Sequence, residues 1–443
     1  MKRLILEQSG DEFYTSHSGL ALIGLCINRY SGLQQQITRK MTGQQDKISH
    51  ADILRSMLGL LCLGKSDYEA VSAMREDDYF KQSLGIRNVP SAERMRQRLD
   101  EGSETFLPVI KDCSVAMLKN GKVPVTGLDT GHIPLDADVF PMDNSNTKKE
   151  GVSRTYHDYH GYAPIAAYLG LEGWCLEVEL RPGSQHSQEG FVPYLNRVID
   201  RARTLTSKKL LVRLDSAHDA LETRLALRGR EKVSYIIKWN PRREDINALC
   251  TKSFAEGMVT EPRPGKKVAL LTVRKSQEHE GKTYVFTKVV RITQRTIDKR
   301  GQILLVPDVT VEGWWTNLDL PEQKIIKLYE NHGLSEQFHS EFKSDLDLER
   351  LPSGKFATNA LIMALGSFAY NILRLIGQLG LLGEYSPVRH PAKRRRLKTV
   401  IQELIYLAAR LVSTARRLKL RFSRHCPGFE AFSRVYARLS AAA

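Results

Sequence analysis

The feature that most constrains the fold is an apolar strand that carries two carboxylates. Residues 132–140 predict a strand, and Asp136 and Asp138 lie two positions apart within it. Side chains at this spacing project from the same face of a sheet, where an unpartnered buried carboxylate is costly. A second apolar strand, residues 209–214, ends directly before Asp215. Carboxylates at such strand ends indicate either a catalytic or metal site or, for Asp215, a cap on the following helix.

The surrounding pattern predicts an α/β domain, because short β runs alternate with helices after residue 122. Residues 241–313 change to Val/Thr/Ile alternation punctuated by turn residues, which predicts a β-rich insertion. The remaining expected strands are residues 165–169, 174–180 and 233–238, with helices at 188–203 and 220–228. Within the insertion, strands are expected at 268–273, 283–293 and 302–311.

The two ends of the chain are predicted to be helical from their apolar spacing. Ser91 begins an arginine-bearing helix that includes Arg94 and Arg98. Together with a short helix at residues 68–74, this helix predicts either a helix-turn-helix-like DNA reader or an ordinary bundle. Helical periodicity returns at residue 322 and is expected to extend over residues 397–420.

Two further features exclude export and membrane insertion in this interpretation. The first apolar run is much shorter than the core of a signal peptide. Residues 356–373 approach membrane-spanning length, but polar residues interrupt them, so a buried core helix is expected. The six cysteines are widely spaced without a C-x-x-C pair, which favours a reducing cytoplasm over a disulfide scaffold or zinc ribbon.

Positive charge gathers near the C-terminus. The chain carries a net charge of +16, and residues 391–443 contain thirteen Lys/Arg against two acids. This basic tail, which includes Arg394, Arg395 and Arg396, predicts contact with a phosphate backbone; the alternative is a solvated basic helix. Lys148, Lys149 and Arg154 follow Asp138 in the chain, and we expect them to line a DNA channel.

A polar helix face supplies a further carboxylate. At about 100° per residue, Tyr329, His332, Glu336 and Lys343 fall within a sector of roughly 60°. This face offers Glu336 to join the two aspartates, flanked by groups that hold phosphate oxygens. Gly333 costs such a helix about 1 kcal/mol relative to alanine. Oxygen donors without a nearby cysteine suit a hard cation such as Mg²⁺.

The spacing of these four residues resembles a signature of a known protein family. The spacing Tyr329-x2-His332-x3-Glu336-x6-Lys343 resembles the Y-x2-R-x3-E-x6-K signature of bacterial insertion-sequence DDE transposases, with His332 in place of arginine. Further segments resemble, in order, the body of a group 1 transposase DDE domain, and the similarity covers most of the chain. These segments are residues 136–145, 147–151, 161–164, 181–186, 214–216 and 368–371.

The resemblance implies an RNase H-like catalytic core with the β-rich insertion placed before the last catalytic helix. It assigns Asp138, Asp215 and Glu336 as the catalytic triad, with Asp136 as the lesser candidate for the first position. The triad would hold two Mg²⁺ or Mn²⁺ ions. The expected domains are a helical DNA-binding region (1–125), the core (126–240 and 314–385), the insertion (241–313) and a basic helical tail (386–443).

The implied function is that of a transposase that binds terminal inverted repeats, cleaves DNA and transfers strands. We expect DNA as the partner, a homodimer at synapsis, no membrane, and a bacterial cytoplasmic location at the nucleoid. In this resemblance, His332 and Lys343 position phosphates, and Tyr329 contacts a base or phosphate. The alternatives are a non-catalytic transposase-derived DNA-binding protein and a divalent-metal nuclease that does not join strands.

Two weaker motifs remain. His157 and His160 lie three apart, which fits a zinc site less well than DNA contact or surface polarity. Trp314 and Trp315 follow the insertion and either stack on a splayed base or pack in the core.

Overall fold

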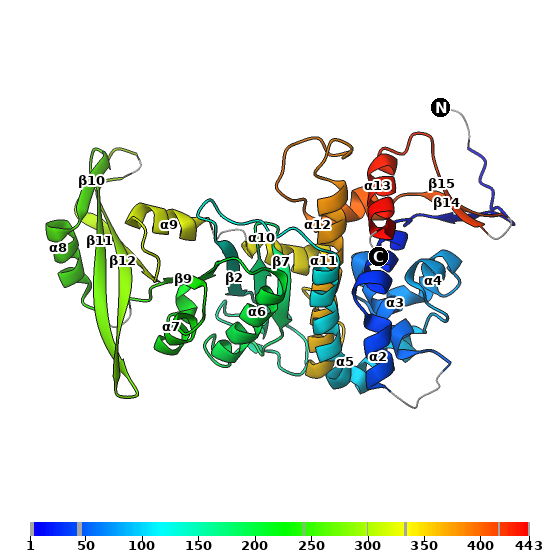
Figure 1. The fold of residues 1–443 in the computed structure, drawn as a ribbon, viewed down its shortest axis with the longest axis horizontal. Coiled ribbons are helices and arrows are strands. Elements are labelled where there is room, and N and C mark those ends of the chain that lie inside the picture. The colour runs from blue at the N-terminus through cyan, green and yellow to red at the C-terminus, as the bar shows by residue number, and fades with distance from the viewer. Residues whose placement is uncertain are drawn as a thin grey trace.

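The computed structural model describes residues 4–41, 47–241, 244–298, 300–331, 335–414 and 417–441. A β-rich arm stands at one end of the long axis, a mixed sheet with helices lies in the middle, and a helical bundle lies at the other end (Figure 1). The first and last described elements, β1 (Phe13–Thr15) and α13 (Phe429–Ala441), both lie at the bundle end. The chain is therefore a mixed α/β protein, as its sequence pattern predicted.

The N-terminal region is helical, as predicted. Its longest helix, α5 (Ala92–Asn120), begins at Ser91, whose hydroxyl accepts a hydrogen bond from the Arg94 backbone N–H at 3.2 Å. This bond satisfies one of the orphan donors of the first turn and confirms the expected helix start. The other helical elements are α1 (Leu20–Leu25), the π-helical η1 (Cys26–Tyr30), α2 (Leu33–Lys40), α3 (His50–Cys62), the 3-10 helix η2 (Tyr68–Met74) and α4 (Asp78–Leu84).

The helix-turn-helix interpretation is not supported, because α4 lies between η2 and α5. Arg98 is 7% exposed, and its guanidinium lies 3.7 Å from the Glu101 carboxylate. Arg94 is half-buried and donates to the Gln97 side chain at 3.0 Å. The arrangement favours the ordinary bundle, and the burial of Arg98 withdraws it from the set of predicted DNA contacts.

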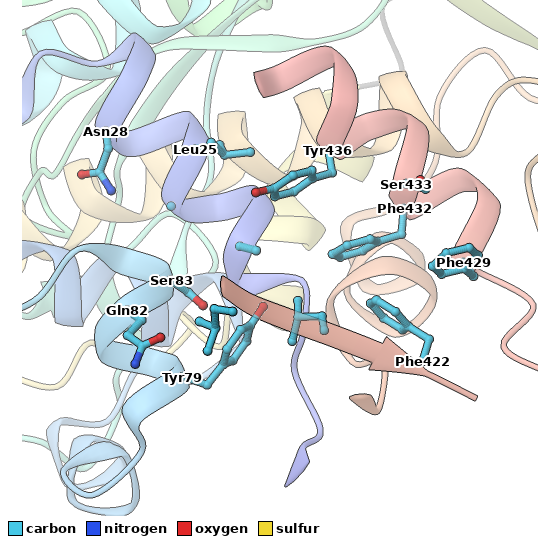
Figure 2. A pocket seen from close by; sticks show the side chains of 14 residues that line it. Leu25, Asn28, Tyr79, Gln82, Ser83, Phe422, Phe429, Phe432, Ser433 and Tyr436 are labelled. Atoms are coloured by element: carbon cyan, nitrogen blue, oxygen red, sulfur yellow. The ribbon is translucent and has the colours of Figure 1, made fainter. Parts of the chain in front are cut away.

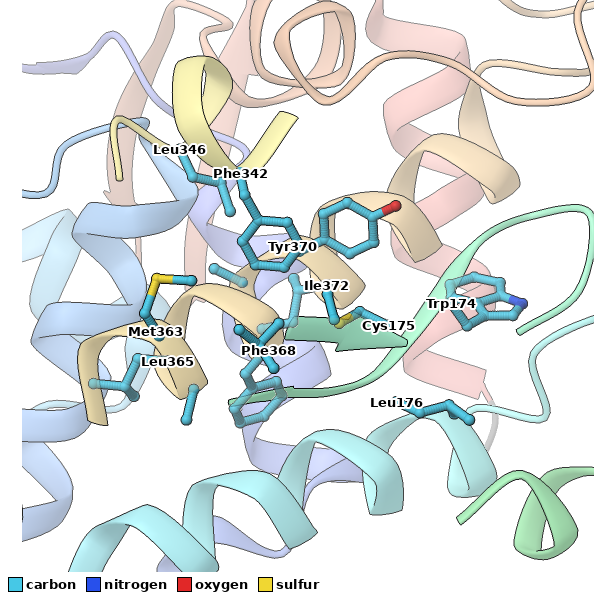
Figure 3. Close-up of a cluster of buried hydrophobic side chains, with 14 of the residues drawn as sticks. Trp174, Cys175, Leu176, Phe342, Leu346, Met363, Leu365, Phe368, Tyr370 and Ile372 are labelled. Atoms are coloured by element: carbon cyan, nitrogen blue, oxygen red, sulfur yellow. The ribbon is translucent and has the colours of Figure 1, made fainter. Parts of the chain in front are cut away.

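The long apolar segment forms α11 (Phe356–Gly380), a buried core helix as expected. Its length and composition would suffice to cross a membrane, but nearly all of its side chains are buried inside the protein. It packs against α5, α3 and β7 (Trp174–Glu179), and Figure 3 shows Cys175 of β7 beside Ile372 of α11. Asn371 explains one polar interruption, because its side chain bonds both the N–H (3.0 Å) and the carbonyl (2.7 Å) of Cys175.

Five strands at one end of the nine-stranded sheet lie in the middle of the molecule (Figure 1), and all five were predicted. β2 (Ile133–Val139) pairs in parallel with β8 (Leu210–Leu214), which pairs in parallel with β9 (Val233–Lys238). On the other side, β2 pairs antiparallel with β6 (Ile165–Leu169), and β6 pairs antiparallel with β7. The helices α6 (Phe191–Leu205) and α7 (Leu221–Arg228) precede β8 and β9. The central order is thus β7-β6-β2-β8-β9.

The predicted β-rich insertion extends this sheet. β13 (Ile303–Thr316) joins it by pairing Trp314 with Lys238 and Thr316 with Ile236 of β9. Outward from β13 lie β12 (Lys282–Ile297), β11 (Lys266–His279) and β10 (Met258–Arg263), all antiparallel. The insertion also contains α8 (Ile246–Glu256), which the sequence pattern did not predict. After it come α9 (Glu322–Glu330), α10 (Ser335–Ser340) and the π-helical η4 (Glu341–Asp345).

The expected basic helical tail is wrong in its middle part. Helix α12 (Leu397–Val400) and the π-helical η5 (Ile401–Ile405) are followed by two strands, β14 (Ala409–Thr414) and β15 (Arg417–Phe422). β14 also pairs with β1, so the first and last parts of the chain share one sheet. The physical reason is a period of two in β15, where Arg417, Lys419 and Arg421 alternate with apolar residues.

Candidate active site

Two neighbouring parallel strands carry the predicted aspartates to one edge of the central sheet. Asp138 lies near the end of β2, and Asp215 follows the last residue of β8. The Asp215 carboxylate caps the 3-10 helix η3 (Ser216–His218) by accepting from the Ala217 N–H at 3.2 Å. Its side chain is nonetheless 41% exposed. The capping role and the cleft position therefore coexist at Asp215.

Asp136 has a different environment. It pairs with Arg213 across the β2–β8 ladder, and both oxygens accept from the guanidinium at 2.6 Å. The two side chains are 8% and 2% exposed, and Arg213 also donates to the Leu328 carbonyl at 2.8 Å. A buried carboxylate engaged bidentately by arginine is poorly placed to bind a metal ion. Of the two candidates for the first position, the geometry therefore favours Asp138.

Asp138, Asp215 and Glu336 line one cavity of about 510 Å³. Glu336 is exposed in the first turn of α10, the short helix that packs near β2. The rest of the lining comes from the end of β2, the turn before β5 (His160–Tyr162) and the α10–η4 segment. Residues more than 70 positions apart in the sequence thus line one cleft.

The predicted single helix does not continue unbroken from Tyr329, because α9 ends at Glu330 and Asn331 lies in a turn. Burial raises the pKa of the Tyr329 hydroxyl, and the charges of Asp215 and Asp138 raise it further, so this phenol lies in the field of the aspartates. Lys343 lines the cavity, donates to the Pro141 carbonyl and lies 3.6 Å from the Glu349 carboxylate. His332 lies outside the described residues.

Two residues that line the cavity were not singled out in the sequence. His339 is buried one turn after Glu336, stacks on the Phe140 ring at 4.4 Å and places Nδ1 4.0 Å from the Asp138 carboxylate. Its spacing of three from Glu336 on one helix was the available signal. Tyr156 is exposed, and its hydroxyl donates to the Val139 carbonyl at 3.4 Å. No periodic pattern marks Tyr156, because it lies in a turn.

The donors around the cavity suit a hard divalent cation. Asp138, Asp215 and Glu336 supply carboxylate oxygens, which Mg²⁺ and Mn²⁺ prefer. Within the described part of the chain, no three His, Cys, Asp or Glu side chains lie close enough together to hold one ion. The residues therefore fit the metal in chemical type and in sharing one cleft, without forming a compact ligand cluster.

Of the three cations predicted to line a DNA channel after Asp138, two are exposed and one is half-buried. Lys148 and Arg154 are exposed, and Arg154 forms an ion pair with Asp158 at 2.8 Å. Lys149 is half-buried and donates to the Leu351 carbonyl, which ties the loop after β3 (Met142–Asp143) to the segment after η4. Lys148 and Arg154 are thus the members of this group best placed for phosphate contact.

The basic run at residues 394–396 contacts α10 and η4. Arg394 donates to the Gln337 side chain of α10 at 2.9 Å. Arg395 is buried and donates to the carbonyls of Leu381, Val388 and His390. Arg396 bonds both carboxylate oxygens of Asp345 in η4. Arg395 is therefore a structural residue, whereas the Arg396 side chain remains 41% exposed beside Asp345, so the expectation of an entirely DNA-facing run is wrong for Arg395.

Two other cavities have contrasting chemistry. One of about 980 Å³ lies beside Arg213 and is lined by five cations, Arg213, Lys324, Lys327, Lys393 and Arg394, and by two carboxylates, Asp129 and Glu330. The other, of about 510 Å³, lies between α1, α4, β15 and α13, and Figure 2 shows its aromatic side chains, including Tyr79, Phe422, Phe432 and Tyr436. None of the described residues that line this second cavity is a carboxylate, lysine, arginine or histidine. The cationic cavity therefore suits a polyanion, whereas the aromatic one does not resemble the carboxylate site.

The family model described as transposase DDE domain group 1 matches residues 1–443. A comparison with curated proteins gave no match. Among solved structures, the chain is similar to a piggyBac transposase in a synaptic complex with hairpin DNA. That similarity covers 90% of this chain and 82% of the other at 10% sequence identity, with a TM-score of 0.42.

Proposed function

The chain belongs to the transposase DDE domain group 1 family, and on that premise we propose that it is the transposase of an insertion sequence, which binds terminal inverted repeats, cleaves DNA and joins strands. The observation that carries this proposal is the meeting of Asp138, Asp215 and Glu336 at one cavity. A protein that only binds DNA has no need of three carboxylates at a cleft that must admit phosphates.

The proposed core is RNase H-like. Its support is the central strand order β7-β6-β2-β8-β9, in which β6 alone runs antiparallel to both of its neighbours. The first two carboxylates come from the adjacent parallel strands β2 and β8, and the third comes from a helix after the insertion. This arrangement matches what the sequence resemblance implied for such a core.

Asp138, Asp215 and Glu336 would hold two Mg²⁺ or Mn²⁺ ions. Bound there, the ions supply charge that activates an attacking water or 3′-hydroxyl and neutralises the leaving oxygen. The protein's part is to orient the scissile phosphate. Lys343 lies at the same cavity as a cation for a phosphate oxygen, and the charges of Asp215 and Asp138 raise the pKa of the Tyr329 hydroxyl. Lys324, Lys327 and Lys393 line a neighbouring cavity along which the DNA backbone can run.

The proposed partner is DNA, at the element's ends and at the target, and a homodimer would hold two ends together. The test is an incubation of the purified protein with Mg²⁺ and a plasmid that carries the inverted repeats flanking its gene. End cleavage followed by joined products supports a transposase. Cleavage without joining indicates a nuclease, and end binding without cleavage indicates a non-catalytic derivative; either result overturns the proposal.

A further inference from the structure

The turn that joins β4 (Ser153–Arg154) to β5 projects aromatic rings next to the carboxylates. This Tyr156 turn, residues 155–159, is closed by hydrogen bonds. The Thr155 N–H donates to the Tyr159 carbonyl at 2.8 Å, and the Asp158 N–H donates to the Thr155 carbonyl at 3.1 Å. Asp158 adopts a left-handed conformation (φ 64°), and its carboxylate pairs with Arg154. The rings are therefore carried on a pre-organised turn rather than on an irregular loop.

Tyr156 is the most informative ring of this turn. Its side chain is 62% exposed although its hydroxyl bonds the carbonyl of Val139, the residue directly after Asp138. The Tyr156 and His157 rings lie 4.5 Å apart, and the His157 and Tyr159 rings are nearly parallel at 6.1 Å. Among the rings that line the carboxylate cavity, Phe140 and His339 are buried, whereas Tyr156 and His157 are exposed.

Trp314 and Trp315, which the sequence suggested as rings that stack on a splayed base, are not exposed at the surface. Trp314 is 1% exposed and Trp315 is 3% exposed. The Trp314 ring packs against Tyr329, and the Arg224 guanidinium covers the Trp315 ring. The core-packing alternative therefore holds for both residues, and the exposed aromatic surface beside the carboxylates belongs to the Tyr156 turn.

We propose that the Tyr156 turn is a binding site for an unpaired nucleobase, which stacks on the Tyr156 ring while the adjacent phosphate lies at the carboxylates. The inference rests on the proposed function, because the phosphate that orients the base is the scissile one. An exposed aromatic ring accepts any base, since every base has a π face. Arg154, the residue directly before the turn, is exposed, and its guanidinium, paired with Asp158, offers positive charge to the backbone of the same nucleotide.

Binding to synthetic DNA tests this site without requiring cleavage. Two duplexes of the element's end would be compared in Ca²⁺, one blunt and one with a single unpaired 3′-terminal 2-aminopurine. We expect the wild type to bind the second duplex about 5- to 150-fold more tightly, the range that corresponds to stacking of one base on an aromatic ring. We also expect 2-aminopurine fluorescence to be quenched, because the base stacks.

Three variants separate stacking from folding. Tyr156→Ala should remove both the affinity gain and the quenching, whereas Tyr156→Phe should keep both, because the ring remains. Tyr14→Ala is the matched control, since Tyr14 is also 62% exposed and lies in β1, which belongs to a different sheet from the strands that carry the carboxylates. This control should behave like the wild type.

The inference is overturned if the wild type binds the two duplexes equally, or if Tyr156→Ala keeps the preference for the unpaired base. Failure of the proposed function gives a different result, namely a wild type that does not cleave end DNA in Mg²⁺. A protein that discriminates the unpaired base but never cleaves would retain the nucleobase site and lose the transposase assignment.

Discussion

Asp136 and Arg213 face each other across β2 and β8 and form a buried bidentate ion pair with both bonds at 2.6 Å. Asp136 lies two residues before Asp138 in β2, and Arg213 lies two residues before Asp215, which directly follows β8. Because side chains two apart share a face, the ion pair and the two proposed metal ligands lie along the same side of the sheet. The pair thus fixes the register that brings Asp138 and Asp215 to one cleft.

Asp136→Asn should therefore destabilise the protein by about 3–5 kcal/mol, because it leaves the Arg213 guanidinium buried without its counter-charge. Thermal or urea unfolding measures the effect. The control is the double variant Asp136→Leu with Arg213→Met, which removes both charges and should recover most of the loss. Wild-type stability of Asp136→Asn would contradict the structural role and reopen Asp136 as a metal ligand.

Asp138→Asn should reduce metal binding without destabilising the protein. The Asp138 side chain is 23% exposed at the cleft, so its neutralisation should leave stability unchanged or slightly raised by relieving repulsion among the carboxylates. We expect Mn²⁺ binding measured by calorimetry to be lost or weakened at least tenfold, that is, by about 1.4 kcal/mol. Full Mn²⁺ affinity in this variant would remove Asp138 from the metal site.

The outward face of β15 offers a test of DNA contact that avoids the structural arginines. Arg417, Lys419 and Arg421 are exposed and alternate with residues that line the cavity of Figure 2. Replacing all three with alanine should flatten the salt dependence of end binding by up to about 0.9 log-log units per lost phosphate contact. A variant that loses Lys119, Lys122 and Lys208 instead has the same net charge and should keep the slope. Equal slopes for both variants would argue against a DNA-binding role for β15.

Glu177 should make stability depend on pH. Burial raises the pKa of its carboxyl, but the attraction of Lys111, Arg201 and Arg197 outweighs this effect and leaves the pKa below its ordinary value of 4.5. A lowered pKa stabilises the folded state above about pH 4.5, and the stabilisation is lost as the pH falls. Glu177→Gln should thus cost about 3 kcal/mol at pH 7 and progressively less below pH 4.5. If Glu177→Gln lowers the free energy of unfolding by the same amount at pH 7 and below pH 4.5, lost packing is the cause instead.

The strands and carboxylates of the core could be predicted because their signals are local. β6 and β9 have the predicted bounds, since both are short apolar runs between turn residues. The aspartates stood out because charge within an apolar strand requires a partner. The partner of Asp136 was not evident, because Arg213 is 77 positions away and only the sheet register brings the two together.

The errors have equally physical causes. β14 and β15 were assigned to a helix because their leucines also satisfy a helical spacing, and pairing with the distant β1 decides between the two. Arg98 and Arg395 were counted as DNA contacts because composition does not show which arginines are buried. Tyr156 escaped notice because a turn residue gains its role only from what it faces.

The most direct test of the central claim is a comparison of wild type and Asp215→Ala in single-turnover cleavage and joining of end DNA in Mg²⁺, with end binding measured in the same samples. Binding energy comes mainly from phosphate contacts elsewhere, so end affinity should be nearly unchanged. Cleavage and joining should fall below detection, because one of the three carboxylates is lost. Wild-type-like cleavage by Asp215→Ala would contradict the assignment of this cleft as the active site.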